Sequence, residues 1–164
     1  MDEAKRNARN KERLEELYPT FRNRLKKVIA EMESAGLRPR IQDAWRSPAD
    51  QLKAFKAGHS KLKYGFHNVT GPKGEKQSLA VDMIDDNNPL NSAKSYLLQL
   101  AAAGRRNGLN TGIAWGLPQN LSDAVDHAIA THTWSVNVKI GWDPTHVEPA
   151  NFSVVDAKLG KRPT

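Results

Sequence analysis

The first 36 residues carry an apolar stripe at helical spacing. Its members follow one another at three- and four-residue steps: Leu14, Leu17, Phe21, Leu25, Val28, Ile29 and Met32. Pro19 interrupts the stripe, so the pattern predicts a short basic lead-in helix and a longer helix that begins near Pro19 and Thr20. Gly36 is suited to end the second helix. We expect the basic residues of the lead-in helix to form a solvated face, with contact to a polyanion as the alternative.

Strand patterns occur later in the chain. Arg40–Trp45 predicts a short strand, and Leu79–Ile84 predicts a buried strand that contains one carboxylate. Trp134–Ile140 alternates apolar and polar residues, which predicts a further strand. Asn110–Trp115 fits a short strand or a turn, and the polar turn at Gly141–Pro149 is expected to lead into a last short strand.

Helices are predicted between these strands. Ser47 and Pro48 suit the start of a helix that reaches about Gly58, because Ser is a good N-cap and Pro fits the first turn. Asn91 or Ser92 is expected to cap a helix that runs to about Asn107. A further helix is expected at 122–132, and residues 59–78 are expected to form a loop. Helices and strands do not alternate as parallel βαβ units would, so the expected fold class is α+β with a small, largely antiparallel sheet.

Length and composition limit the organisation and the chemistry. With 164 residues, the chain fits a single domain, 1–164, with an N-terminal helical segment at 1–36, a core at 40–150 and a flexible tail at 158–164. The absence of cysteine excludes disulfide scaffolds, thiolate metal sites and thiol catalysis. No apolar run approaches the roughly 18 residues that a membrane span needs. The charged N-terminus leads into no apolar segment, so no secretory signal is expected.

The net charge of +7 favours polyanionic surroundings. Nucleic acid, anionic lipid and acidic cell-wall polymer all fit, and a basic surface that faces only solvent is the alternative. The chain carries no recognisable nucleic-acid-binding module and no cluster of stacking aromatics. We therefore do not expect nucleic acid to be the partner.

Polar residues within apolar surroundings mark the candidate site. Asp82 interrupts an apolar strand pattern, which is costly unless the carboxylate is paired or binds metal. Pro144 breaks the regularity of the last strand, so Asp143 is able to turn toward the side chain of His146. Glu148 shares a face with His146 and is suited to anchor it. Two histidines and one aspartate with an open fourth position match a catalytic zinc site, whereas a salt bridge would explain Asp82 alone.

Several motifs, in this order, resemble the zinc D-Ala-D-Ala carboxypeptidase and L-alanyl-D-glutamate endopeptidase family, which includes vancomycin-resistance dipeptidases and phage endolysins. The resemblance covers roughly residues 40–150 and rests on Trp45–Ser47 with Gln51, on Gly65–Asn68 leading to Leu79–Asp82, and on Asp143–Glu148. It implies a compact α+β domain of the DD-peptidase or hedgehog type, with a central antiparallel sheet. This fold agrees with the one expected from the sequence pattern.

The resemblance also assigns roles to residues of this chain. It implies that one zinc ion is held by His67, Asp82 and His146. Asp143 would be the general base, and Arg46 would stabilise the oxyanion or hold a substrate carbonyl or carboxylate. Three residues would support the site: Gln51 by positioning the loop of the arginine, Glu148 by anchoring a ligand, and Trp142 by lining the cleft.

The function implied is that of a zinc peptidase that hydrolyses stem peptides of bacterial peptidoglycan. Cleavage between L-Ala and D-Glu by a phage-type endolysin is the first choice. D-Ala-D-Ala carboxypeptidase activity or an interbacterial effector of the same chemistry are alternatives. From other classes, a non-catalytic zinc or cell-wall-binding module and a basic nucleic-acid-binding protein remain open. We expect a monomer, made in the host cytoplasm without a signal peptide and acting on the cell wall after release.

One departure from the family pattern concerns spacing. His67 and Asp82 are 15 positions apart, eight more than is usual in the family, and the extra segment is approximately Thr70–Gln77. Ser78 occupies a position where the family prefers glycine. A surface insertion adds little closure entropy, so the site can survive it. A flap over the cleft and a disordered surface loop are both open for this segment.

Other candidate ligands have weaker claims. His59, His127 and His132 are not expected to bind metal, since the first lies in a loop and the other two lie on different faces of a helix. Trp115 is expected to belong to the core.

Overall fold

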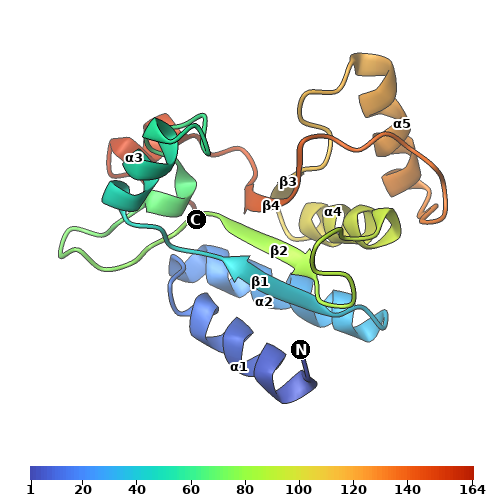
Figure 1. Ribbon diagram of the computed structural model, residues 1–164, viewed down its shortest axis with the longest axis horizontal. Helices are drawn as coiled ribbons and strands as arrows, with labels where there is room; N and C mark the ends of the chain where they lie inside the picture. Colours follow the sequence, from blue (N-terminus) through green and yellow to red (C-terminus); the bar gives the residue numbers. More distant parts are fainter.

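A four-stranded antiparallel sheet runs through the computed structural model, which describes residues 1–164 (Figure 1). The strands are β1 (Pro39–Asp43), β2 (Val81–Asp85), β3 (Leu109–Gly112) and β4 (Asp143–Pro149), and their order in the sheet is β1-β2-β4-β3. Every neighbouring pair is antiparallel. The fold class is therefore α+β, as predicted.

Two N-terminal helices pack against the β1 side of this sheet (Figure 1). α1 (Glu3–Leu14) ends before Pro19, and α2 (Pro19–Ser34) begins with that proline, as the sequence predicts. The predicted apolar stripe is buried in the core. Gly36 follows α2 with a φ of +81°, a conformation that glycine adopts without strain.

Of the basic residues of α1 that were expected to form a solvated face, Lys5 and Lys11 are exposed but Arg6 and Arg9 are not. Arg6 is only 1% exposed; it pairs with Glu33 and donates to the carbonyl of Pro39, at 2.8 Å in each case. Arg9 donates to the carbonyl of Ile41 at 2.9 Å. The helix pattern did not reveal this because the acceptors, Glu33 of α2 and backbone carbonyls of β1, are far away in the sequence. These arginines fasten α1 to the sheet and are not free for a polyanion.

The remaining helices are α3 (Pro48–Lys56), the one-turn 3-10 helix η1 (Phe66–Asn68), α4 (Lys94–Arg106), α5 (Gln119–Ala130) and α6 (Val154–Lys158). Ser47 caps α3 by accepting the N–H of Asp50 at 3.0 Å, as predicted. The cap expected at Asn91 or Ser92 is wrong. α4 starts after Ala93, and the Ser92 hydroxyl accepts the N–H of Asp85 instead. No helix is both long enough and apolar enough to cross a bilayer.

The strand predicted at Trp134–Ile140 is also wrong. This segment leads from α5 to β4 and pairs with no other strand. Val138 is buried in the core, and Trp134 and Ile140 pack partly against it. Val136 is exposed, so the alternation of apolar and polar residues reflects a connection that touches the core at separate points and not the face of a strand.

The extra segment between His67 and Asp82 forms a small hairpin. Thr70 bridges Lys76, and the N–H of Gly71 donates to the carbonyl of Glu75 at 2.8 Å. No residue of 70–77 lines the pocket that contains His67 and Asp82, so the flap alternative is wrong for this structure. The hairpin base instead meets the C-terminal tail, where Arg162 donates to the carbonyl of Thr70 at 2.9 Å.

The segment 158–164 was expected to be a flexible tail. Besides the contact of Arg162 with the hairpin, the carbonyl of Pro163 accepts the Thr20 hydroxyl at 2.8 Å. The carbonyl of Thr164 accepts a guanidinium N–H of Arg24 at the same distance. In this structure the tail is thus hydrogen-bonded to α2 and to the hairpin.

Candidate metal centre

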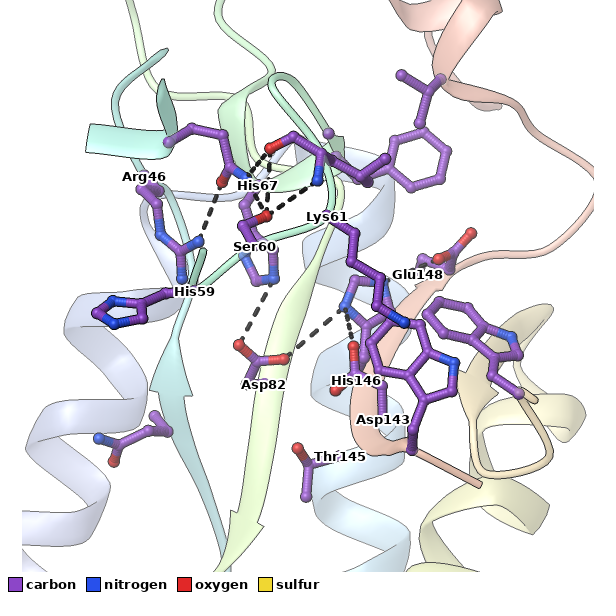
Figure 2. A pocket seen from close by; sticks show the side chains of 18 of the residues that line it. Arg46, His59, Ser60, Lys61, His67, Asp82, Asp143, Thr145, His146 and Glu148 are labelled. Atoms are coloured by element: carbon purple, nitrogen blue, oxygen red, sulfur yellow. Dashed lines mark hydrogen bonds and ion pairs between the residues drawn. The ribbon is translucent and has the colours of Figure 1, made fainter. Parts of the chain in front are cut away.

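Three side chains from separate elements meet at one end of the sheet (Figure 2). They are His67 of η1, Asp82 of β2 and His146 of β4, and one potential ligand atom of each lies within 4.8 Å of the others. These are the three residues to which the family resemblance assigns zinc binding. The structure therefore contains a possible metal-binding triad.

The sheet itself brings two of the three together. Asp82 and His146 are directly paired in the antiparallel ladder of β2 and β4, and residues so paired point to the same face of a sheet. The shortest contact between them joins His146 Nδ1 and Asp82 Oδ1 at 3.8 Å.

Backbone hydrogen bonds from Leu79 and Arg46 hold the segment that carries His67. The N–H of Leu79 donates to the carbonyl of Phe66 at 3.0 Å, and the N–H of Arg46 donates to the carbonyl of His67 at 2.9 Å. Asn68 adds a side-chain bond to the carbonyl of Arg46. The bond between Leu79 and Phe66 joins the two ends of the segment that contains the hairpin. The longer spacing between His67 and Asp82 therefore does not displace His67. Ser78 is buried, and its hydroxyl bonds to the carbonyls of Ala44 and Ala80.

Hydrogen bonds fix which nitrogen of each histidine is free. His67 Nδ1 lies 2.6 Å from the carbonyl oxygen of Ala44, which only accepts, so this nitrogen donates and Nε2 keeps its lone pair. His146 Nε2 lies 2.8 Å from a carboxylate oxygen of Glu148, which leaves Nδ1 free. Both free nitrogens face Asp82, which lies 3.6 Å from His67 Nε2. Outer partners of this kind orient metal-binding histidines, so the donor set fits a divalent metal such as zinc, cobalt or manganese.

The electrostatics of the group favour a cation. Burial works against the Asp82 carboxylate, but the contact with His146 and the charge of His67 outweigh it and lower the pKa of Asp82. Burial also works against a charged His146, yet the contacts with Asp82 and Glu148 raise the pKa of that imidazole to about 9, so without a metal Nδ1 carries a proton that a bound cation would replace. The carboxylates therefore attract positive charge, as a metal site must.

Asp143 lies beside the triad because β4 is irregular at its start. The register of β3 and β4 shifts between Thr111 and Gly112, so that Gly112 is opposite Asp143. A Cβ at Gly112 would meet the carbonyl oxygen of Asp143 at 2.1 Å, so the close approach of the chains needs glycine there. Asp143 Oδ2 comes to 3.8 Å from His146 Nδ1. Burial raises the pKa of Asp143 and outweighs the opposing effect of His146, which suits a group that takes and returns a proton.

Arg46 lines the same pocket but is already paired. Its guanidinium lies 2.5 Å from a carboxylate oxygen of Asp43 and donates to Gln51 Oε1 at 3.0 Å. A role of Gln51 in positioning Arg46 requires a contact of this kind between the two side chains. Part of the positive charge of Arg46 is thus neutralised within the protein.

These residues line a pocket of about 690 Å³. Trp142 lines it and is 60% exposed. Trp115 also lines the pocket, with its ring 5.1 Å from that of His146, so its assignment to the core is wrong. Lys61 and Thr145 line it too, and sequence reasoning missed both. Neither residue shows a pattern that could have revealed it, since the contacts that bring them here are tertiary.

The other histidines lie apart from the triad. His127 and His132 do not line the pocket. His59 does line it, but it is not part of the group of potential ligands. The expectation that none of the three binds metal stays a prediction.

Comparison with solved structures finds a match to an L-Ala D-Glu endopeptidase. The crystal structure of the L-Ala D-Glu endopeptidase ChiX of Serratia marcescens superposes with a TM-score of 0.54 over 87% of this chain and 87% of that one, at 18% sequence identity. No protein-family model and no curated protein sequence matches. At this identity the similarity concerns the fold, so the chain shares the α+β fold of a known L-Ala D-Glu endopeptidase.

Proposed function

We propose that this protein is a zinc-dependent peptidase that hydrolyses stem peptides of bacterial peptidoglycan, and that it cleaves between L-Ala and D-Glu. The observation that carries the proposal is the set of two histidines whose free nitrogens face Asp82 within an open pocket. The fold shared with an L-Ala D-Glu endopeptidase supports the choice of substrate. We further propose that the protein acts as a phage-type endolysin, which reaches the wall after release from the cytoplasm.

The proposed chemistry divides the work among residues of the pocket. His67, Asp82 and His146 would hold the metal, and a zinc ion bound there supplies Lewis-acid activation of water and of the scissile carbonyl. Asp143 takes a proton from the attacking water on its carboxylate and later returns it to the leaving amine. Glu148 keeps His146 in the tautomer that leaves Nδ1 free.

Arg46 has a separate role in this proposal. Two of its contacts go to Asp43 and Gln51, which fix the plane of the guanidinium. The remaining N–H groups are available to the oxygen that becomes negative when water adds to the carbonyl. A fixed donor of this kind stabilises the transition state without reorganisation.

Two synthetic peptides test the proposal. One contains the L-Ala–D-Glu bond of a stem peptide, and the other ends in D-Ala-D-Ala. We expect the zinc-loaded protein to cleave the first, chelator-treated protein to cleave neither, and added zinc to restore activity, as followed by chromatography of the products. Release of terminal D-Ala alone would instead indicate a carboxypeptidase. Stoichiometric zinc binding without cleavage of either peptide would indicate a non-catalytic module.

A further inference from the structure

Lys61 is the pocket lysine that the proposed chemistry does not use. It lies in the loop between α3 and η1, and Figure 2 shows it reaching across the pocket toward the side of His146 and Asp143. Its ammonium group has no carboxylate within 4.0 Å and instead lies over the ring of Trp142, 5.0 Å from the centroid. Arg46, by contrast, is paired with Asp43 at 2.5 Å. Lys61 thus offers the pocket a positive charge that no protein carboxylate neutralises.

The loop that carries Lys61 is fixed on both sides of it. Gln51 is only 4% exposed, and its side-chain nitrogen donates to Ser60 Oγ and to the carbonyl oxygen of Leu62, at 2.7 Å in each case. The other end of the same amide accepts from Arg46. The buried side chain of Gln51 therefore fixes the backbone on both sides of Lys61 and also contacts Arg46. Fixing the loop in advance reduces the entropy that a ligand must supply on binding.

Trp142 holds the ammonium group at the opening without occupying its hydrogen-bonding capacity. A cation–π contact at an exposed site is weaker than a hydrogen bond between charged groups. A ligand carboxylate can therefore take the ammonium group of Lys61 while Trp142 remains beside it.

The carboxylates of the pocket limit where an anionic ligand can go. Asp82, Asp143 and Glu148 all lie on the side of the metal-binding triad. Their charges repel a ligand carboxylate that does not itself bind the metal. Lys61 is where such a carboxylate finds an unneutralised cation.

We propose that Lys61, held by Gln51 and Trp142, forms a subsite that binds a carboxylate of the peptide substrate beside the scissile bond. This inference rests on the proposed function and makes it more specific, because it selects acidic peptides over their amidated forms. Lys61 is a specificity-determining residue in this account, and Gln51 is a positioning residue.

The test compares two stem peptides that differ only in the α-carboxylate of D-Glu, which is free in one and amidated in the other. We expect Lys61→Met to raise KM for the free-acid peptide about tenfold and to leave its kcat within twofold. The same substitution should leave KM and kcat for the amidated peptide unchanged. Lys61→Arg, which keeps the charge, should retain most of the preference. Lys27→Met, at an exposed lysine of α2 outside the pocket, is the matched control and should affect neither peptide.

Direct binding of the same peptides separates this inference from the proposed function. Calorimetric titration of the zinc-loaded Asp143→Asn variant, which should not turn the peptides over, is expected to show tighter binding of the free-acid peptide, with a difference that an added Lys61→Met abolishes. If the protein cleaves neither peptide but shows this difference, the subsite stands and the peptidase proposal fails. Equal effects of Lys61→Met on the two peptides, no effect on either, or no preference of the wild-type protein would overturn the subsite.

Discussion

Asp143 is the residue on which the proposed proton transfer depends. Its carboxylate lies 3.8 Å from the free nitrogen of His146, and burial is the main cause of its raised pKa. Asp143→Asn keeps the shape of the side chain but cannot accept the proton, so turnover of a cleavable peptide should fall by at least about 100-fold. Zinc content, measured by mass spectrometry of the metal, should stay at one ion per chain. Asp123→Asn on α5, outside the pocket, is the control, and unchanged turnover in Asp143→Asn would contradict the mechanism.

A substitution of Asp82 tests the metal site itself. It faces the free nitrogens of both histidines, so Asp82→Asn removes the negative charge at the centre of the triad. Substituting residues that merely support metal ligands weakens binding by about 10–100-fold, so this change should cost at least tenfold in zinc affinity. Competition with a coloured chelator measures the change.

His127 provides the matched control for Asp82. It lies on α5 outside the pocket and outside the potential ligand group. His127→Ala should therefore bind zinc as the wild-type protein does. If Asp82→Asn and His127→Ala behaved alike, the triad would not be the zinc site.

At the scale of elements, the docking of α1 depends on ion pairs and therefore on pH. Hydrogen bonds from Arg6 and then Arg38 lower the pKa of Glu3 from its ordinary value of 4.5 to about 2. Since the folded-state pKa is depressed, the stabilisation is present above pH 4.5 and is lost as the pH falls toward 2. Glu3→Gln should thus have a lower Tm than the wild-type protein at pH 6, and the gap should shrink between pH 4.5 and pH 2.

Thermal unfolding followed by circular dichroism measures this gap. Glu12→Gln is the control, because Glu12 is exposed on the same helix and makes no ion pair in the structure. Its Tm should stay close to that of the wild-type protein throughout. A gap for Glu3→Gln that did not change with pH would show that the ion pairs do not hold α1.

Elements whose pattern is local could be predicted from the sequence, and elements that depend on distant partners could not. The break at Pro19 and the cap at Ser47 depend on neighbours in the chain, and both are confirmed. The strand expected at Trp134–Ile140 failed because hydrogen-bond pairing requires a free neighbouring strand, which alternation alone does not provide. Ser92 bonds to Asp85, a contact across a turn that a cap preference does not reveal.

The candidate site shows the same division. His67, Asp82 and His146 come together as predicted, because the resemblance to a family supplied the tertiary information that spacing lacks. Lys61 could not be predicted, since its place in the pocket depends on the bonds of Gln51 to the loop around it.

At the scale of the whole molecule, positive charge gathers beside the pocket. Residues 48–77 and 152–164 contain nine Lys or Arg and three Asp or Glu, which accounts for most of the net charge of +7. These segments form α3, the hairpin and α6, which lie at one end of the molecule (Figure 1). An acidic cell-wall polymer would therefore be attracted to the end that carries Lys61 and the pocket.

Salt tests this attraction. Retention of the Asp143→Asn variant on purified bacterial cell walls should fall as sodium chloride rises from about 50 to 300 mM, because the Debye length shrinks across this range. Cosedimentation measures the bound fraction. Retention that is independent of salt would show that the basic end does not drive contact with the wall.

The most direct test of the central claim is a digest of purified peptidoglycan, with and without a chelator, analysed by mass spectrometry for new amino termini. The account predicts release of fragments with new D-Glu amino termini, loss of this release on chelation and its return with zinc. Cleavage that persists in chelator, or no cleavage by protein that holds one zinc ion per chain, would contradict the claim that His67, Asp82 and His146 form the centre of a metal-dependent peptidase.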